Sequence, residues 1–276
     1  MISNLIQFFI IIILSIYVFY GLVLYFGQEK LIFYPVEYNQ NEIKKIEKEI
    51  QHFQFKTYTK NKEIRITYWE SEPKSDIFKM ILYFGGNAEN TNYTAIEISE
   101  HPELLSYKWI LVNYPGYNGS SGIPSEKNFY IMAEEIYDFL NNLYKDRIKE
   151  SIVIGRSIGT AVASYLCVVK KTKKLILITP FDSIKNIGKS LFPFYPFSFL
   201  IKHKFPTIDY IKKIENPIFI LIAEYDEIIP ESSTKNLLKA IANKKNTNVY
   251  TIKDSNHNTI SNSQEYWIYL KNFLEK

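Results

Sequence analysis

Cysteine is nearly absent from this sequence of 276 residues, in which Cys167 is the only one. A single thiol excludes an intrachain disulfide framework, and it excludes a zinc site built on several thiolates. Residues 162–168 around it have an apolar pattern typical of a helix. We therefore expect Cys167 to be a buried core thiol.

Charged side chains are absent before Glu29. The apolar run Leu5–Phe26 would form a helix of about 33 Å, which matches a hydrocarbon core of about 30 Å. Its tyrosines lie toward the C-terminal end, where interfacial aromatic residues are common. A cleaved signal peptide would begin with basic residues, and residues 1–4 contain none. The sequence therefore predicts an uncleaved, single-pass membrane anchor over residues 1–27.

Basic side chains flank this predicted span on one side only. No Lys or Arg precedes it, and lysines follow it at positions 30, 44, 45 and 48. The positive-inside rule then predicts that the large domain lies in the cytoplasm.

Arginine is also scarce, and lysine is spread along the chain together with glutamate, for a net charge of +4. No basic stripe interleaved with aromatic residues occurs, so we expect no nucleic-acid partner. Gly85-Gly86 lacks the Lys-Ser/Thr of a phosphate loop and the spacing of a dinucleotide fingerprint. His101 has no second histidine at metal-ligand spacing. The sequence predicts neither a metal nor a cofactor.

Residues 28–276 contain no Gly/Ser linker, repeat or low-complexity tract, and we interpret them as one domain. The pattern predicts a short helix over residues 39–51, then an antiparallel hairpin over residues 53–68 with its turn at 60–62. Short continuous apolar runs follow, as expected of strands buried on both faces of a parallel sheet. These runs are Met80–Phe84, Trp109–Val112, Ile152–Ile154, Leu175–Ile178, Ile218–Ile222 and Val249–Ile252.

Helical patterns lie between the apolar runs, and the clearest covers Phe129–Tyr144. The face that this helix is expected to bury consists of Ile131, Met132, Ile136, Phe139, Leu140 and Leu143. Alternating strands and helices predict an α/β fold, with an open, mostly parallel sheet of about eight strands and helices on both faces.

One aromatic segment interrupts this alternation. Its prolines block a regular helix at several points, and it is too aromatic for an ordinary solvated loop. We interpret residues 189–206 as a short cap over one end of the sheet. His203 lies in this cap between two lysines, and we expect it to be a solvated surface side chain.

The motif Gly155-Arg156-Ser157-Ile158-Gly159 follows one predicted strand and opens a predicted helix over 158–169. A serine on such a tight turn is held out of the sheet with its hydroxyl exposed, and the glycines allow the close backbone approach that the turn needs. The helix N-terminus supplies N–H groups that stabilise an oxyanion. We interpret Ser157 as a nucleophile.

A serine nucleophile needs a base, which is usually a histidine oriented by a carboxylate. His257 lies just after the last predicted strand and before a C-terminal helix over 264–274, which favours it as the base. Asp226, at the end of the penultimate strand, is the favoured acid. Asp182, one strand earlier, stays open as a second candidate. Asp254, three residues before His257, is a third candidate, but we interpret it, like Glu227, as a solvated loop residue.

An oxyanion hole needs two backbone donors. Ile158, the residue after the serine, supplies one N–H. The loop Gly85-Gly86-Asn87 after the first parallel strand supplies the other, and Asn87 is the best candidate.

At this point the sequence resembles the α/β-hydrolase superfamily, and within it the small membrane-anchored serine hydrolases of the ABHD type. The segments that carry the resemblance are YFGGNAEN at 83–90, NYPGYNGSSGIPSE at 113–126, GRSIG at 155–159, TPFDSI at 179–184 and AEYDEIIP at 223–230. The resemblance covers residues 28–276 and implies a serine esterase, thioesterase or lipase. It implies a triad of Ser157, Asp226 and His257.

The sequence departs from this family at two positions. The family usually has His-Gly-Asn in the oxyanion loop, where Gly85 takes the place of the histidine. This change predicts looser support of the loop, without loss of a donor N–H. Asp182 stands where relatives often have threonine, which keeps the assignment of the acid open.

We therefore expect a membrane-anchored serine hydrolase that cleaves a carboxylic ester or an acyl thioester, and the anchor and aromatic cap favour a lipid-derived substrate. Two alternatives remain: a catalytically silent hydrolase-like protein that binds a partner or lipid, and a serine peptidase of the same fold.

Overall fold

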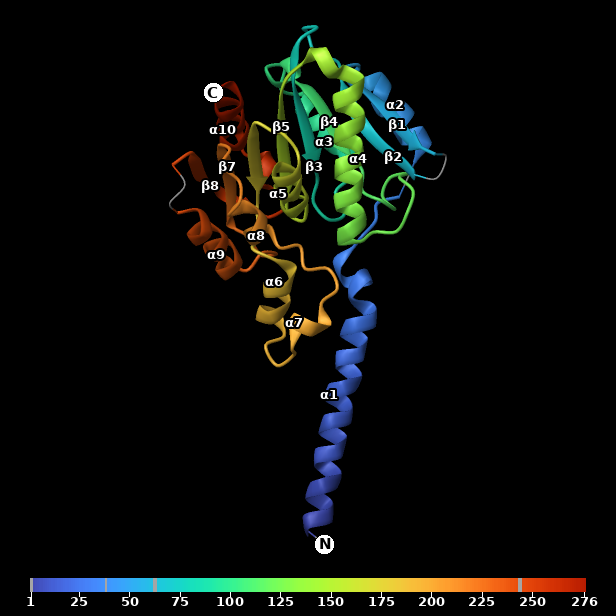
Figure 1. The fold of residues 1–276 in the computed structure, drawn as a ribbon, viewed down its shortest axis with the longest axis vertical. Coiled ribbons are helices and arrows are strands. Elements are labelled where there is room, and N and C mark those ends of the chain that lie inside the picture. The colour runs from blue at the N-terminus through green and yellow to red at the C-terminus, as the bar shows by residue number, and fades with distance from the viewer. Residues whose placement is uncertain (1, 38, 62–63, 243–244) are drawn as a thin grey trace.

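In the part of the chain that the structure describes, eight strands form one central sheet (Figure 1). The structure is a computed structural model that describes residues 2–37, 39–61, 64–242 and 245–276. In chain order the strands are β1 (Phe53–Lys60), β2 (Ile64–Ser71), β3 (Phe78–Phe84), β4 (Lys108–Val112), β5 (Ile148–Arg156), β6 (Lys174–Ile178), β7 (Ile218–Tyr225) and β8 (Thr247–Asn256). Their order across the sheet is β1-β2-β4-β3-β5-β6-β7-β8.

The direction of the strands agrees with the sequence prediction. β1 pairs with β2 and β2 with β4 in the antiparallel sense, and the pairs from β4 to β8 are parallel. The predicted hairpin is confirmed, with Lys60 opposite Ile64, while residues 62 and 63 of its turn lie outside the described residues. All six predicted apolar runs are strands. The first five are buried on both faces of the sheet, whereas the run in the edge strand β8 is largely exposed.

Helices cover both faces of the sheet (Figure 1). They are α1 (Ile2–Ile32), α2 (Gln40–Ile50), α3 (Thr91–Ser99), α4 (Glu126–Tyr144), α5 (Gly159–Val169), α6 (Ile184–Leu191), α7 (Phe197–Leu200), α8 (Thr207–Ile211), α9 (Glu231–Ile241) and α10 (Gln264–Glu275), with 3-10 turns at Leu104–Ser106, Lys145–Arg147 and Ile260–Asn262. One core contains residues of α4, α5, α8 and α9, and the other contains residues of α2, α3 and α10. Successive residues of β3 enter opposite cores, Leu82 the first and Tyr83 the second.

The buried face of α4 differs from the one that the sequence predicts. Met132, Ile136 and Leu140 are buried as expected, but Ile131 and Leu143 are exposed. Phe129, Tyr130, Ala133 and Tyr137 are buried in addition. The helix is rotated because these aromatic residues pack against the aromatic side chains of neighbouring elements, including Tyr114 and Phe205.

Cys167 is a buried thiol of α5, as predicted. Burial raises the pKa of this thiol to about 12, so about one thiol in ten thousand is ionised at pH 8. We expect the folded full-length protein to resist a chromogenic disulfide reagent for an hour at pH 8, and to react with one equivalent once it is denatured. Rapid reaction of the folded protein with one equivalent would contradict this burial.

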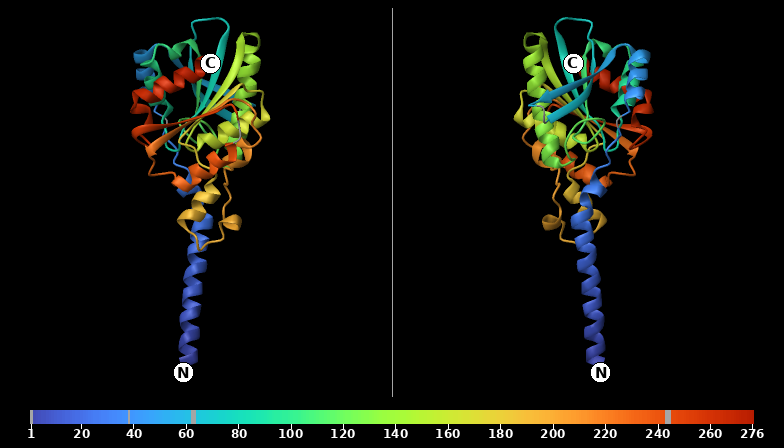
Figure 2. Two further views of the ribbon diagram at one scale, coloured as in Figure 1. Left: turned by 90° about the vertical axis from the view of Figure 1, so that its left-hand side faces the viewer. Right: turned by 90° about the vertical axis from the view of Figure 1, so that its right-hand side faces the viewer.

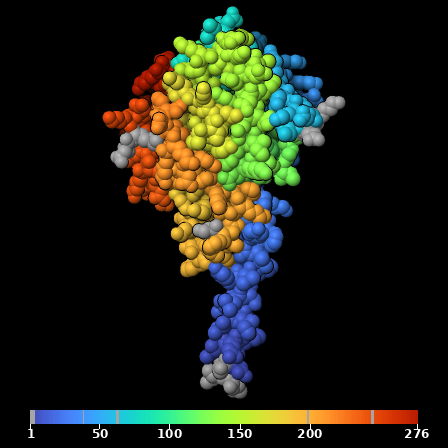
Figure 3. Space-filling model, viewed as in Figure 1, coloured from blue at the N-terminus to red at the C-terminus, as the bar shows by residue number. Residues whose placement is uncertain are grey.

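α1 projects from the body of the molecule as a stalk (Figures 1 and 3). Among the described residues it is the one helix long and apolar enough to cross a membrane, and no residue of its most apolar stretch is buried inside the protein. The helix continues to Ile32, five residues beyond the predicted anchor. Both side views place α6 and α7 next to the upper part of α1 (Figure 2).

Candidate active site

Ser157 occupies a sharp turn between β5 and α5. Its φ is +50°, in the left-handed region that a residue with a side chain rarely adopts. The backbone is held on both sides, because the N–H of Ser157 donates to the carbonyl of Ile178 (2.9 Å) and its carbonyl accepts from the hydroxyl of Thr160 (2.6 Å). The strain is therefore fixed by neighbouring strands and not relieved locally.

Glycine is required on both sides of this turn. A Cβ on Gly155 would lie 2.3 Å from the carbonyl oxygen of Gly159, and a Cβ on Gly159 would lie 2.0 Å from the carbonyl oxygen of Phe84. Both distances are shorter than any real contact of these atoms. Gly155 therefore allows α5 to approach β5, and Gly159 allows α5 to approach the end of β3.

His257 and Asp226 leave neighbouring strands at the same level. Tyr225 of β7 pairs with Asn256 of β8, and the next residue of each strand carries one of these side chains. Nδ1 of His257 lies 3.0 and 2.9 Å from the two carboxylate oxygens of Asp226. The N–H groups of Ile228 and Ile229 donate to the same carboxylate (3.0 and 2.8 Å), so its orientation is fixed.

Asp182 is separate from this pair and fully buried. Its carboxylate accepts hydrogen bonds from the hydroxyl of Ser233 (2.6 Å), from the N–H of Ser183 (2.6 Å), and from the amide groups of Asn186 (2.8 Å) and Asn236 (3.1 Å). These partners lie at the start of α6 and on α9. Asp182 therefore joins two helices, and the carboxylate beside His257 is that of Asp226.

The loop after β3 lies directly against the nucleophile. A Cβ on Gly86 would be 3.5 Å from Cβ of Ser157, which is ordinary van der Waals contact. Among the described residues, the backbone N–H groups of Asn87 and Ile158 have no hydrogen-bond partner. The N–H of Gly86 donates to Glu89 (2.6 Å) and is occupied. The N–H groups of Asn87 and Ile158 are thus free to donate, one in this loop and one in the residue after Ser157.

The side chain of Asn87 ties this loop to the end of α1. Its Nδ2 donates to the carbonyl of Ile32 (2.7 Å), and its Oδ1 accepts from the N–H of Tyr34 (3.0 Å) and the hydroxyl of Tyr117 (2.8 Å). The hydroxyl of Tyr114 donates to the carbonyl of Gly85 (2.7 Å). These bonds support the loop in which the sequence lacks the family's histidine.

Glu89 and Arg156 connect the loops of the site, and the sequence analysis assigned neither a role. Besides Gly86, Glu89 accepts from the hydroxyl of Tyr83 (2.7 Å) and lies 3.7 Å from the guanidinium of Arg156. Arg156 donates to the carbonyl oxygens of His257 (3.3 Å) and Asn258 (3.1 Å). Two local features of the sequence could have indicated these roles. Glu89 lies three residues after Gly86, and Arg156, one of few arginines in the chain, lies just before Ser157.

The charge of Arg156 is maintained although the side chain is buried. Burial acts most strongly, to lower its pKa, but the electrostatic interactions with Glu89, Tyr83, Tyr266 and Glu97 together more than offset this, so the pKa lies above its ordinary value. Burial also raises the pKa of Tyr83 well above its usual range, which keeps the phenol protonated as a donor to Glu89. The pair Glu89–Arg156 thus connects the loop after β3 with the loop that carries His257.

We expect Glu89→Gln to lower kcat about 10- to 100-fold, because a hydrogen bond between charged groups contributes about 1.5–3 kcal/mol. KM should change little, since Glu89 positions donors and is not expected to touch the substrate. The measurement is steady-state hydrolysis of a chromogenic ester, with Glu100→Gln, an exposed glutamate of the same region, as the matched control. Equal rates for the two variants would contradict the positioning role.

His203 is not the solvated side chain that the sequence predicts. Its Nδ1 accepts from the N–H of Glu126 (3.3 Å), its ring meets Phe33 edge-on at 5.1 Å, and the side chain is only 12% exposed. Burial lowers its pKa below the ordinary value. The flanking lysines indicated a surface, but packing against the residue that follows α1 encloses this ring.

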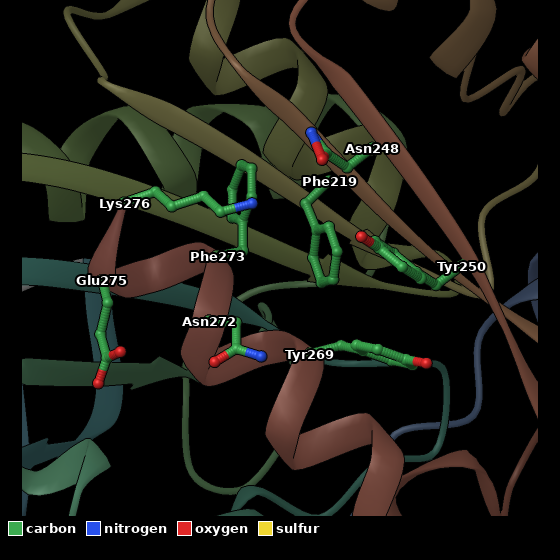
Figure 4. A pocket seen from close by; sticks show the side chains of 8 residues that line it. All are labelled: Phe219, Asn248, Tyr250, Tyr269, Asn272, Phe273, Glu275 and Lys276. Carbon is green, nitrogen blue, oxygen red and sulfur yellow. The ribbon is translucent and has the colours of Figure 1, made fainter.

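A cavity of about 460 Å³ lies away from these groups, at the outer edge of the sheet (Figure 4). It is lined by Phe219, Asn248, Tyr250, Tyr269, Asn272, Phe273, Glu275 and Lys276. Phe219 and Asn248 lie at the amino ends of β7 and β8, whereas Asp226 and His257 follow the carboxyl ends. Within the described residues, no group of three or more His, Cys, Asp or Glu side chains is arranged to hold a metal ion.

Comparisons by sequence find proteins named for this fold. An uncharacterized protein of Mycobacterium tuberculosis is 28% identical over 165 residues, which are 60% of this chain and 58% of the relative. Alpha/beta hydrolase domain-containing protein WAV2 of Arabidopsis thaliana is 28% identical over 71% of this chain and 70% of its own. Alpha/beta hydrolase domain-containing protein 17B of Homo sapiens is 29% identical over 59% of this chain and 55% of its own. The chain thus spans less than two thirds of the first and last of these relatives.

Comparisons by structure agree with those by sequence. An esterase of Pyrococcus furiosus superimposes with a TM-score of 0.67 at 18% identity, covering 88% of this chain and 97% of that chain. An alpha-beta hydrolase of Vibrio vulnificus superimposes with a TM-score of 0.68 at 19% identity, covering 93% and 92%. No family model matches the chain. The predicted α/β-hydrolase fold is confirmed, and so is the resemblance to proteins of the ABHD type.

Proposed function

We propose that this protein is a membrane-anchored serine hydrolase that cleaves a carboxylic ester or an acyl thioester. Ser157, His257 and Asp226 would form its triad, with the N–H groups of Asn87 and Ile158 as the oxyanion hole. The observation that carries the proposal is the contact of His257 with both oxygens of Asp226. The carbonyl of the same His257 accepts a hydrogen bond from Arg156, the residue before the strained Ser157.

The chemistry follows from the roles of these groups. Asp226 accepts a hydrogen bond from Nδ1–H of His257, which leaves Nε2 free to take the proton of Ser157 as its Oγ attacks the acyl carbonyl. The oxyanion that forms accepts hydrogen bonds from Asn87 and Ile158. The imidazolium then protonates the leaving alcohol or thiol, and water activated by His257 releases the acyl group from Ser157.

The substrate is proposed to be lipid-derived, and the domain to lie on the cytoplasmic side. A lipid-derived substrate is supported by α1, which is long and apolar enough to span a membrane, and by the cap beside it, residues 189–206, which is rich in aromatic side chains. The side of the membrane rests on the lysines that follow the apolar run.

The test is labelling of the full-length protein in detergent with a fluorophosphonate probe. We expect the wild type to be labelled and Ser157→Ala to be unlabelled, because the probe reacts only with an activated serine. Ser106→Ala, which removes an exposed hydroxyl, is the matched control and should label like the wild type. No label on a wild-type protein shown to be folded would favour the silent binding protein instead.

A labelled protein still has to be distinguished from a peptidase of the same fold. Chromogenic esters and aminoacyl amides, measured side by side, make that distinction. We expect turnover of the esters to exceed that of the amides by at least tenfold, and the reverse order would favour the peptidase.

A further inference from the structure

The cap lies along α1 and contacts it within the apolar run, at Tyr17 and Gly21. The rings of Tyr17 and Tyr195 stack at 4.6 Å, the hydroxyl of Tyr17 donates to the carbonyl of Phe194 (2.7 Å), and the hydroxyl of Tyr195 donates to the carbonyl of Tyr17 (3.2 Å). A Cβ on Gly21 would lie 3.4 Å from the ring of Tyr195. The tip of the cap is therefore fixed at the level of Tyr17 (Figures 1 and 2).

Both segments change from apolar to charged at one common level. α1 is uncharged up to Gln28, and the cap is uncharged over residues 191–201. Gln28 donates to the carbonyl of Leu200 (3.1 Å) and accepts from the N–H of Lys202 (2.7 Å). Just beyond it, Nζ of Lys202 pairs with Glu29 at 3.0 Å. Two stretches far apart in sequence thus share one boundary between apolar and charged residues.

The length of α1 places the tip of the cap inside the membrane. A hydrocarbon core of about 30 Å takes about 20 helical residues. The apolar stretch between Asn4 and Gln28 is only slightly longer, so any placement that keeps both polar residues outside includes residues 8–24. Tyr17 then lies at least seven residues, or about 10 Å, below the boundary. Tyr195, stacked on it, lies at the same depth.

The exposed side chains of the cap suit this depth. Phe194 and Phe199 are 85% and 87% exposed, and Leu191 is also exposed. Burial of such side chains in an acyl phase is favourable. In water these phenylalanines would form an apolar patch with nothing to cover it.

The backbone of the cap is also prepared for a phase without water. An irregular segment is tolerated there only if its polar groups are bonded within the protein. Pro193 and Pro196 have no N–H to satisfy. The N–H groups of residues 192, 195, 197, 199, 200 and 201 donate to carbonyls of the same segment or of Gly188, and among the described residues the N–H of Phe194 has no such partner. The proline content that breaks the helix therefore also removes donors.

The catalytic edge of the sheet lies just above this boundary. The bond from Asn87 to the carbonyl of Ile32 fixes the oxyanion loop four residues beyond Gln28, which is about 6 Å along the helix. α6 leads from the carboxyl end of β6 down into the cap (Figure 1). Because the apolar core ends between residues 24 and 27, Ile32 and the loop bonded to it lie about one to two helical turns above the membrane surface.

We propose that residues 191–201 insert into the acyl region of one leaflet beside α1, and that an acyl substrate enters the site from that leaflet. The occupant of the exposed aromatic surface is thus the lipid bilayer itself. The second part of this proposal rests on the proposed hydrolase function, and the first part does not.

Insertion is tested with nitroxide labels on the full-length protein in phosphatidylcholine vesicles. Phe194→Cys and Phe199→Cys are made in a Cys167→Ala background, with Ile13→Cys on α1 as the membrane reference. Ile77→Cys, an exposed residue before the amino end of β3, is the aqueous reference. We expect the cap labels to collide with oxygen several-fold more than with a water-soluble nickel chelate, as the label at position 13 does. Collision ratios like that of position 77, or a label reached by neither agent, would overturn insertion.

Substrate entry is tested with the double variant Phe194→Asp/Phe199→Asp. Both side chains are exposed, so the fold does not depend on them. We expect turnover of a long-chain ester in the vesicle to fall at least tenfold, and turnover of a water-soluble short ester to stay within twofold. Ile77→Asp/Leu143→Asp, two exposed residues remote from α1, should leave both rates unchanged.

The results separate the two parts. Equal loss on both esters, or no loss on the vesicle ester, would overturn entry from the leaflet. If the wild type hydrolyses neither ester, the proposed function fails, while the collision ratios still decide whether the cap is inserted.

Discussion

Asp226→Asn is expected to lower kcat about 10⁴-fold, the loss found when the carboxylate of a serine–histidine triad is replaced by its amide. Asparagine keeps the size of the side chain, and its Oδ1 can still accept from the N–H groups of Ile228 and Ile229. It loses the negative charge that stabilises the imidazolium and fixes the proton on Nδ1 of His257. The melting temperature should therefore stay close to that of the wild type. The measurement is ester turnover with the concentration of folded protein determined independently.

Asp182→Asn is the matched variant, and its effects should be reversed. An amide at position 182 would face the amide donors of Asn186 and Asn236, leaving buried donors without acceptors. Each unsatisfied buried group costs about 1–3 kcal/mol, so the melting temperature should fall. Turnover per folded molecule should stay within a few-fold of the wild type. If Asp182→Asn abolished turnover and Asp226→Asn did not, the acid would be Asp182.

Gly159→Ala is expected to destabilise the protein by at least about 3 kcal/mol, the upper range for overpacked sites. The new methyl group would lie 2.0 Å from the carbonyl oxygen of Phe84, and only movement of β3 or α5 could relieve this contact. For a domain of this size the melting temperature should fall by roughly 6–12 °C. Turnover should fall as well, because the same movement shifts the serine from its donors.

The control for this variant is Gly27→Ala. A Cβ at Gly27 of α1 has nothing within 4 Å, so alanine there should be neutral or favour the helix slightly. The measurement is thermal unfolding of the full-length proteins in the same detergent. Equal melting temperatures for the two variants would contradict the close packing of the serine turn against β3.

The sequence determined the elements whose signals are local. Continuous apolar runs predicted the parallel strands because a strand buried on both faces has few polar positions. The spacing of glycines around Ser157 predicted the turn because only residues without Cβ allow the approach seen at Gly155 and Gly159. The long uncharged run before Glu29 predicted α1 by length and composition alone.

The tertiary structure decided every feature that depends on residues distant in the chain. The sequence offered three acidic residues as partners of His257. Only the pairing of β7 with β8 brings Asp226 to the imidazole ring. Asp182 is instead hydrogen-bonded to residues at the start of α6 and on α9. Arg156 meets the histidine loop across 101 residues, and Tyr17 meets the cap across 177 residues. No local pattern encodes such contacts, because they depend on where the strand order and the direction of α1 place each loop.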